Sequence, residues 1–228
     1  MRTTRIARAL LTTVALIALP AVAQAQFTVY TTLASYLAAI SAPGTDTFNN
    51  LALGTATAGP LNRAAGAYTY RATSGGDGAF FGAGSASDVW MSNNTSSASI
   101  TFNTFMSSVR GVGGFFFGND VSGAFLAGQT IRLTATNAGG TTIQTLSNTT
   151  TGTFLGFVSP TSFSSLVIEV IQPTSGPTAW VTANDLTLGA GPIAAIVPEP
   201  AMFALLATGL LALGVFAKRH RTRRAEAR

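Results

Sequence analysis

Residues able to perform chemistry are scarce in the middle of this chain. Between residues 26 and 192 there is no histidine, lysine or cysteine; His220 and Lys218 both stand near the C-terminus. This composition excludes Ser-His-Asp and Cys-His catalysis, a Schiff-base lysine, and zinc held by histidine or cysteine. No P-loop or dinucleotide fingerprint occurs either. We therefore expect a non-enzymatic segment that needs no cofactor.

Carboxylates are the remaining acid–base groups of this segment. They are Asp46, Asp77, Asp88, Asp120, Glu169 and Asp185. A glycan hydrolase needs two carboxyl groups that face one glycosidic bond, so a carboxylate-dependent hydrolase remains an alternative. Asp77 and Asp120 stand beside glycine or asparagine, which is typical of turns.

Calcium is the inorganic partner that fits these residues, because it prefers carboxylate, amide and carbonyl oxygens. If the first and last strands of the domain pair, four residues become candidate ligands: Asp46, Asn49, Asn50 and Asp185. Asn184-Asp185 is also typical of a bend or a solvated strand position. Both interpretations stay open.

Two tryptophans are candidates for stacking on sugar rings. Trp90 and Trp180 would make the segment a carbohydrate-binding module if their rings are exposed. In β-rich domains such aromatic side chains also serve as core residues, so this alternative depends on their burial.

The charge of the chain is unevenly distributed. The whole sequence has a formal charge of +5, but residues 26–192 hold four arginines against six carboxylates, a charge of −2. A basic footprint for nucleic acid is therefore absent from the segment that would fold, and we expect no nucleic-acid partner.

Short alternating runs predict an antiparallel β-sandwich, preceded by one short helix in which Leu33, Tyr36, Leu37 and Ile40 share a face. Pro43-Gly44 is expected to end that helix. Asn137 to Gly140 is expected to form a hairpin turn. The expected strands are Phe27–Tyr30, Thr45–Leu51, Ala67–Ala72, Ser97–Phe102, Arg110–Phe117, Thr130–Asn137, Thr141–Leu146, Thr153–Val158, Leu166–Ile171 and Trp180–Leu188.

Residues 1–25 have the pattern of a secretory signal peptide. The positive start carries Arg2, Arg5 and Arg8. An apolar run from Ala9 to Leu19 follows, which is too short to span a bilayer. The small residues Ala23 and Ala25 then predict cleavage by signal peptidase before Gln26.

Residues 193–228 form a second processing segment. The stiff sequence Val197, Pro198, Glu199, Pro200 precedes an uncharged stretch, residues 201–217, that predicts a single transmembrane helix at the short end of what a bilayer requires. A basic tail, residues 218–228, follows at once and includes Lys218, Arg219, Arg221, Arg223 and Arg224. Because positive charge stays cytoplasmic, we expect the domain to lie outside the inner membrane.

This C-terminal segment resembles the PEP-CTERM sorting signal. The resemblance rests on Val197-Pro198-Glu199-Pro200, one short apolar helix and an Arg-rich end, in that order. It implies an exosortase as processing enzyme, transient anchoring in the inner membrane, and delivery to the cell surface or extracellular matrix. It also implies a role in biofilm or envelope assembly, with exopolysaccharide as a partner.

A second resemblance covers the middle of the chain. VYTTLASYLAAI, TDTFNNLALGT and AWVTANDLTLG are similar to the opening and closing segments of jelly-roll-like domains that often precede this signal. Those domains commonly have Phe-Asp or Phe-Glu where this chain has Phe48-Asn49-Asn50. An amide thus replaces a carboxylate, which weakens the case for calcium there. From residues 26 to 192 we expect a jelly-roll-like sandwich.

Overall fold

The computed structural model describes residues 27–191 and 208–210, and the strands lie in the first of these ranges. The nine strands of sheet A are β1 (Thr28–Tyr30), β2 (Ser41–Asp46), β3 (Ala56–Ala58), β6 (Ala79–Ser85), β7 (Asp88–Asn93), β9 (Gly111–Asn119), β10 (Phe125–Leu126), β13 (Phe154–Val158) and β15 (Trp180–Ala190). The six strands of sheet B are β4 (Leu61–Ala65), β5 (Tyr68–Ser74), β8 (Ile100–Asn103), β11 (Thr130–Asn137), β12 (Gly140–Leu146) and β14 (Phe163–Ile171).

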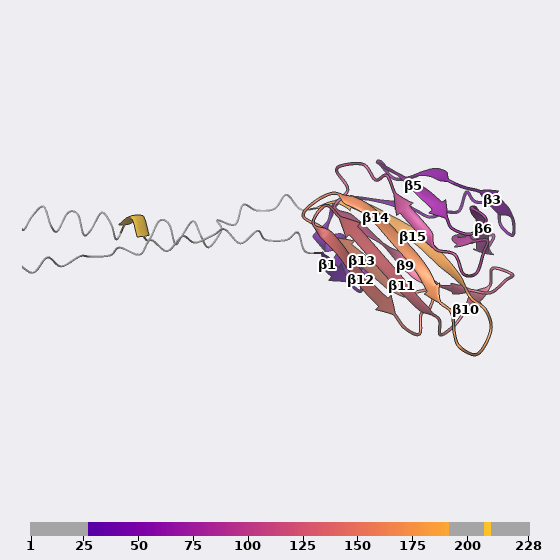
Figure 1. The fold of residues 1–228 in the computed structure, drawn as a ribbon. Coiled ribbons are helices and arrows are strands. Elements are labelled where there is room, and N and C mark those ends of the chain that lie inside the picture. The colour runs from indigo at the N-terminus through magenta and orange to yellow at the C-terminus, as the bar shows by residue number, and fades with distance from the viewer. Residues whose placement is uncertain (1–26, 192–207, 211–228) are drawn as a thin grey trace, which may run out of the picture. The chain divides into compact units, whose positions relative to one another are not determined.

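Both sheets are built from antiparallel pairs. Sheet A has the order β1-β13-β9-β15-β7-β6-β3, with β10 beside β9 and β2 beside β15. Sheet B has the order β12-β11-β14-β8-β5-β4. Figure 1 shows the two sheets as layers, with β11 and β14 of one layer beside β9 and β15 of the other. The prediction of a mainly β, antiparallel fold is confirmed, and the layering is consistent with a β-sandwich.

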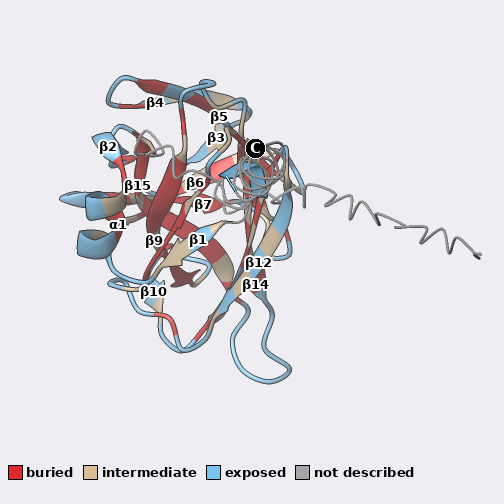
Figure 2. Ribbon diagram, turned by 90° about the vertical axis from the view of Figure 1, so that its left-hand side faces the viewer, coloured by how far each residue is buried: buried red, intermediate tan, exposed pale blue. Residues whose placement is uncertain are grey.

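The core lies between the sheets because alternate residues of each strand point inward. Phe116 and Leu186 contribute from sheet A, while Leu133 and Ile168 contribute from sheet B, and all four are fully buried. Figure 2 shows the buried residues running along β9 and β15. Among the described residues, the buried members of this cluster lie between residues 48 and 188, so residues 27–191 contain a hydrophobic core of their own.

A helix covers part of the face of sheet A that points away from sheet B, over β13 and β9. Helix α1 (Leu33–Ala39) begins at Thr32, whose hydroxyl accepts a hydrogen bond from Ser35 N–H at 3.3 Å. Tyr36 of this helix is fully buried and its ring lies against Phe154, with centroids 5.5 Å apart. The helix can approach because Gly156 has no side chain: a Cβ there would lie 2.5 Å from Tyr36 Cδ2.

Strand β15 contains a bulge that keeps its two halves in register with the core. Val181 and Ala183 point inward, but the next inward residue is Leu186, one position out of phase. The extra residue is Asp185, which has a φ of 50°. Aspartate tolerates this left-handed conformation better than most residues, and a bulge of this kind redirects a side chain locally.

Several element boundaries differ from the sequence prediction. The expected strand Thr45–Leu51 is wrong in position, because β2 ends at Asp46 and Phe48 turns the chain with a φ of 60°. Pro43-Gly44 lies inside β2, and helix α1 has already ended at Ala39. Strands β3, β4, β6, β7 and β10 were not predicted. Alanine, glycine, serine and arginine hide the alternation of the first four, and β10 is only two residues long.

The two processing segments fall largely outside the described residues. This holds for Ala23, Ala25, Gln26, for the motif Val197, Pro198, Glu199, Pro200, and for Lys218, Arg219, Arg221, Arg223 and Arg224. Within the expected apolar helix only residues 208–210 are described, and they are helical. Among the described residues, no helix has the length and apolar character needed to cross a membrane.

Candidate functional site

An open, polar cleft of about 920 Å³ lies beside the β4–β5 hairpin. The segment that follows β2 forms one wall, and β4 and β5 form the other. Its lining is almost entirely capable of hydrogen bonding: Thr45, Asp46, Thr47, Asn49, Asn50, Asn62, Arg63, Ala64, Thr69, Tyr70, Arg71 and Thr104. The cleft is therefore suited to an oxygen-rich ligand rather than an apolar one.

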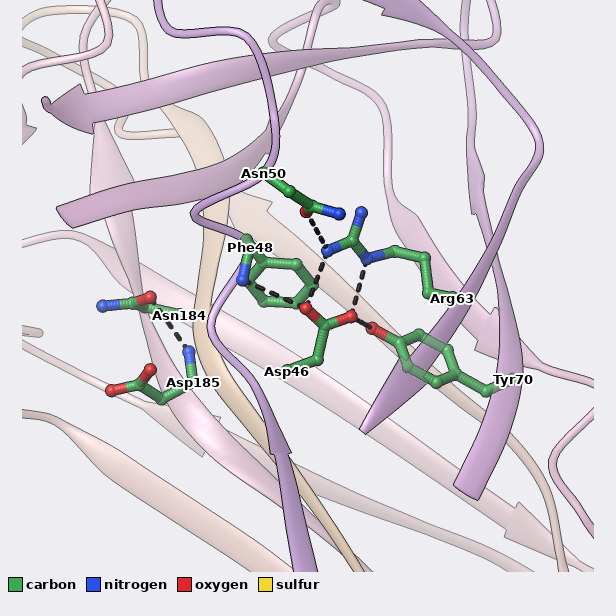
Figure 3. Close-up of polar contacts among 7 residues, drawn as sticks. All are labelled: Asp46, Phe48, Asn50, Arg63, Tyr70, Asn184 and Asp185. Carbon is green, nitrogen blue, oxygen red and sulfur yellow. Dashed lines mark hydrogen bonds and ion pairs between the residues drawn. The ribbon is translucent and has the colours of Figure 1, made fainter. Parts of the chain in front are cut away.

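Asp46 is the centre of a hydrogen-bond network in this cleft (Figure 3). Its Oδ2 accepts hydrogen bonds from Arg63 Nε at 2.7 Å and from Tyr70 Oη at 2.7 Å. Its Oδ1 accepts from Arg63 Nη2 at 2.7 Å and from Phe48 N–H at 3.1 Å. Arg63 Nη2 also donates to Asn50 Oδ1 at 2.8 Å. Four donors thus engage both oxygens of one carboxylate.

The ion pair in this network is buried, with side-chain exposures of 8% for Arg63 and 7% for Asp46. Burial disfavours the Arg63 cation, but the hydrogen bond and charge of Asp46 outweigh this and raise the pKa of Arg63. Burial, followed by the charge of Asp46, raises the pKa of Tyr70 well above its usual value. Tyr70 therefore stays protonated as a donor to Asp46.

Three of the four candidate calcium ligands, Asp46, Asn49 and Asn50, line the cleft, and Asp185 does not. The first strand, β1, pairs with β13, but β2, which carries Asp46, pairs with the last strand, β15, and Asp46 stands opposite Leu186. However, Asn49 Oδ1 accepts a hydrogen bond from Val89 N–H at 2.7 Å, and Asn50 bonds to Arg63. The Asp185 carboxylate points away from Asp46 (Figure 3). A cation at Asp46 would have to displace Arg63, so this arrangement does not favour calcium, and a calcium site stays a prediction.

Two donors of the cleft are unused within residues 27–191. Arg71 of β5 and Asn62 of β4 stand opposite each other across the hairpin, and both are exposed. Neither side chain has a hydrogen-bond or ion-pair partner among the described residues. These two groups offer hydrogen-bond donors to a ligand, whereas the Asp46 carboxylate of the cleft is already bonded to Arg63.

A second polar cluster lies on the outer face of sheet A, where β7 meets β15. Asp88 Oδ2 accepts a hydrogen bond from Trp90 Nε1 at 2.9 Å, and its Oδ1 accepts from Asn184 Nδ2 at 3.2 Å. Burial, followed by the charge of Asp88, raises the pKa of the neighbouring Asp185. Asp88 and Asp185 are thus two neighbouring carboxylates, as the alternative of a carboxylate-dependent hydrolase requires. However, Asp88 is already bonded to Trp90 and Asn184.

The two tryptophans lie on this same outer face and are both half-buried. Trp90 packs edge-to-face on Phe117, with ring centroids 4.9 Å apart. Trp180 lines a small pocket of about 80 Å³ together with Asn93 and Asp120. Asn93 is 1% exposed, and its Oδ1 has no hydrogen-bond partner within the described part of the chain. Neither tryptophan is fully buried, so stacking on a sugar remains open to both.

Sequence reasoning missed the residues that complete these clusters. Arg63 was not assigned any role in binding, and Asp88 was considered only as one of the six carboxylates open to a hydrolase. Arg63 and Tyr70 lie directly opposite each other in the β4–β5 hairpin, so predicting this hairpin would have paired them. The sequence predicted a strand at β5 but none at β4. The turn role predicted for Asp120 is confirmed, because its Oδ1 accepts from Ser122 N–H at 2.9 Å and from Ala124 N–H at 3.0 Å.

Comparison with protein-family models, with curated proteins and with solved structures finds no significant match to this chain. The resemblances to the sorting signal and to jelly-roll-like domains therefore remain predictions that rest on the quoted residues.

Proposed function

We propose that this chain is an exported, non-enzymatic protein of the cell surface or extracellular matrix, sorted by an exosortase. A jelly-roll-like sandwich would be the exported domain. Signal peptidase would remove residues 1–25, and the apolar segment 201–217 would hold the domain on the outer side of the inner membrane until processing near Pro198-Glu199-Pro200. The domain would then join a matrix rich in exopolysaccharide.

One observation carries this proposal: the ordered combination of Pro198-Glu199-Pro200, an uncharged segment and an Arg-rich end. The structure is compatible with it, because residues 27–191, which lie between the two processing segments, contain a hydrophobic core of their own. The absence of histidine, lysine and cysteine from residues 26–192 supports a display role over catalysis.

The test is the intact mass of the protein isolated from host cells with and without the exosortase. We expect a species that lacks both the first 25 residues and the region after Val197, and only when the protease is present. Pro200→Ala should prevent this processing, whereas Pro192→Ala, just outside the motif, should not. A full-length tail in both strains would contradict the proposal and leave a permanent single-pass anchor.

A second candidate function is glycan recognition on the outer face of sheet A. The observation that favours it is the position of two half-exposed tryptophans on one face, one of which lines a small pocket. An indole face packs against the apolar face of a sugar ring. This is a binding function that needs no acid–base group.

Affinity electrophoresis in polysaccharide-containing gels tests the second candidate. We expect Trp180→Ala to weaken retention about tenfold, and Trp90→Ala to weaken it as well. Met106→Ala, which removes another exposed apolar side chain, is the control and should leave retention unchanged. Equal retention of all three folded variants would remove the tryptophans from consideration.

A further inference from the structure

The edges of the two sheets differ in how well they are protected. Sheet A ends in β1 and β3, which are three residues long each. Sheet B ends in β4 on one side, where Arg63 supplies a charge and Gly44 of β2 packs tightly on Ala65. Short strands, charges and covering segments are the usual means by which proteins prevent edge-to-edge pairing.

The other edge of sheet B has none of these protections among the described residues. Strand β12 is seven residues long and contains neither proline nor a charged residue. No charged residue occurs anywhere between Arg132 and Glu169, and these two form an ion pair with each other at 2.7 Å. The outward N–H and C=O groups of β12 therefore form an uncharged edge that can accept another strand.

The outer face of sheet B points to what that strand would be. A row of β-branched residues crosses the sheet in register and ends at the unprotected edge. The row runs Thr73, Thr101, Val167, Thr134 and Ile143. Ile143 is its last member and is 58% exposed, so the row ends in an apolar side chain with no neighbour beyond it in the described residues. Cross-strand pairs of β-branched residues stabilise sheets.

We infer that β12 pairs antiparallel with β12 of a second copy of this chain, about a two-fold axis through Ile143. This register places Ile143 opposite Ile143 of the second copy, Thr142 opposite Gln144, and Thr141 opposite Thr145. It joins two sheets into one and continues the β-branched row across the axis. In a two-fold contact the same strand meets itself, so a charged strand would bring like charges close together. Strand β12 carries no charge and avoids this repulsion.

The oligomeric state of residues 26–192 tests the inference, since this segment contains its own core. In sedimentation equilibrium we expect the mass to rise from monomer to dimer with concentration. Ile143→Lys should hold the protein monomeric, because it places two ammonium groups opposite each other. Ile171→Lys is the matched control: Ile171 is also an exposed isoleucine of sheet B, at 42%, and its replacement should leave the dimer intact.

The lack of cysteine in the chain allows the register itself to be tested. Cα atoms of directly opposite residues lie within reach of a disulfide, so Ile143→Cys should cross-link two copies on mild oxidation. Thr145→Cys should not, because the two copies of residue 145 would be offset by about 13 Å along the strands. Cross-linking at Thr145 but not at Ile143 would overturn the inference.

A monomer at every concentration would also overturn it, as would an Ile143→Lys variant that dimerises like the parent. Circular dichroism identifies any variant that fails to fold, and Ile143→Glu then serves as the second variant of the axis residue, again expected to be monomeric because it places two carboxylates opposite each other. None of these results depends on the sorting signal, so the inference and the proposed function can fail separately.

Discussion

The buried ion pair between Asp46 and Arg63 allows a quantitative test of the cleft. Removing one partner of such a pair costs about 3–5 kcal/mol, because the other charge is left buried without compensation. Asp46→Asn keeps the shape of the side chain and an acceptor for Phe48 N–H, but it removes the charge that Arg63 requires. We expect it to lower the free energy of unfolding by about 3 kcal/mol, near the lower end of the range, because the cleft is open to water.

The reverse substitution should have a similar effect. Arg63→Met keeps most of the aliphatic length and leaves the Asp46 carboxylate with Tyr70 Oη and Phe48 N–H as donors. The double variant removes both charges together, so its cost should fall short of the sum of the single costs by about 2 kcal/mol. This shortfall measures the coupling between the two side chains.

Urea unfolding of residues 26–192 measures the free energy of unfolding of the parent, the two single variants and the double variant. If this free energy falls with urea at the same slope in all four proteins, the comparison is valid. Arg132→Met is the matched control: it breaks a 2.7 Å ion pair with Glu169 whose side chains are 46% and 33% exposed. That loss should cost below about 1 kcal/mol. If Arg63→Met costs no more than Arg132→Met, or if the two single costs simply add, the reasoning from desolvation is refuted.

Two further substitutions test local features of sheet A. Because the pKa of Asp185 is raised, the contribution of this side chain to the stability of the folded state is present at acid pH and is lost as the pH rises through that pKa. Asp185→Asn should therefore raise the free energy of unfolding by about 0.5 kcal/mol at neutral pH and by less in acid. Equal gains at both pH values would contradict this prediction. Gly156→Ala should cost about 1–3 kcal/mol in urea unfolding because its Cβ would meet Tyr36, whereas Gly152→Ala, with its nearest neighbour at 3.8 Å, should be neutral.

The strands that sequence reasoning located best are those whose packing is local and regular. Strand β11 matches its predicted range because Ile131, Leu133 and Ala135 alternate with polar residues along its length. Its hairpin partner β12 follows from the turn at Asn137 to Gly140, which the register of the pair confirms. In both strands the pattern and the turn chemistry point to the same answer.

The strands that were missed depend on partners far away in the sequence. Strand β4 reads Leu-Asn-Arg-Ala-Ala, and its Arg63 occupies a position where an apolar residue would have revealed the alternation. Arg63 is accepted there because Asp46, seventeen residues earlier, supplies the opposite charge. A single sequence shows both residues but not their contact, so the central interaction of the cleft was not foreseeable from local pattern.

In β15, the pairing of the strand and the direction of its side chains have to be predicted separately. The strand that carries Asp46 does pair with the last strand, yet pairing fixes only which backbone segments are neighbours. The direction of a side chain depends on strand phase, and the phase changes between Ala183 and Leu186 because Asp185 is an inserted residue. The spacing of these apolar residues, three positions instead of two, already requires a bulge if both point inward. Asp185 therefore faces Asp88 instead of Asp46, and the correct strand pairing does not bring the two carboxylates together.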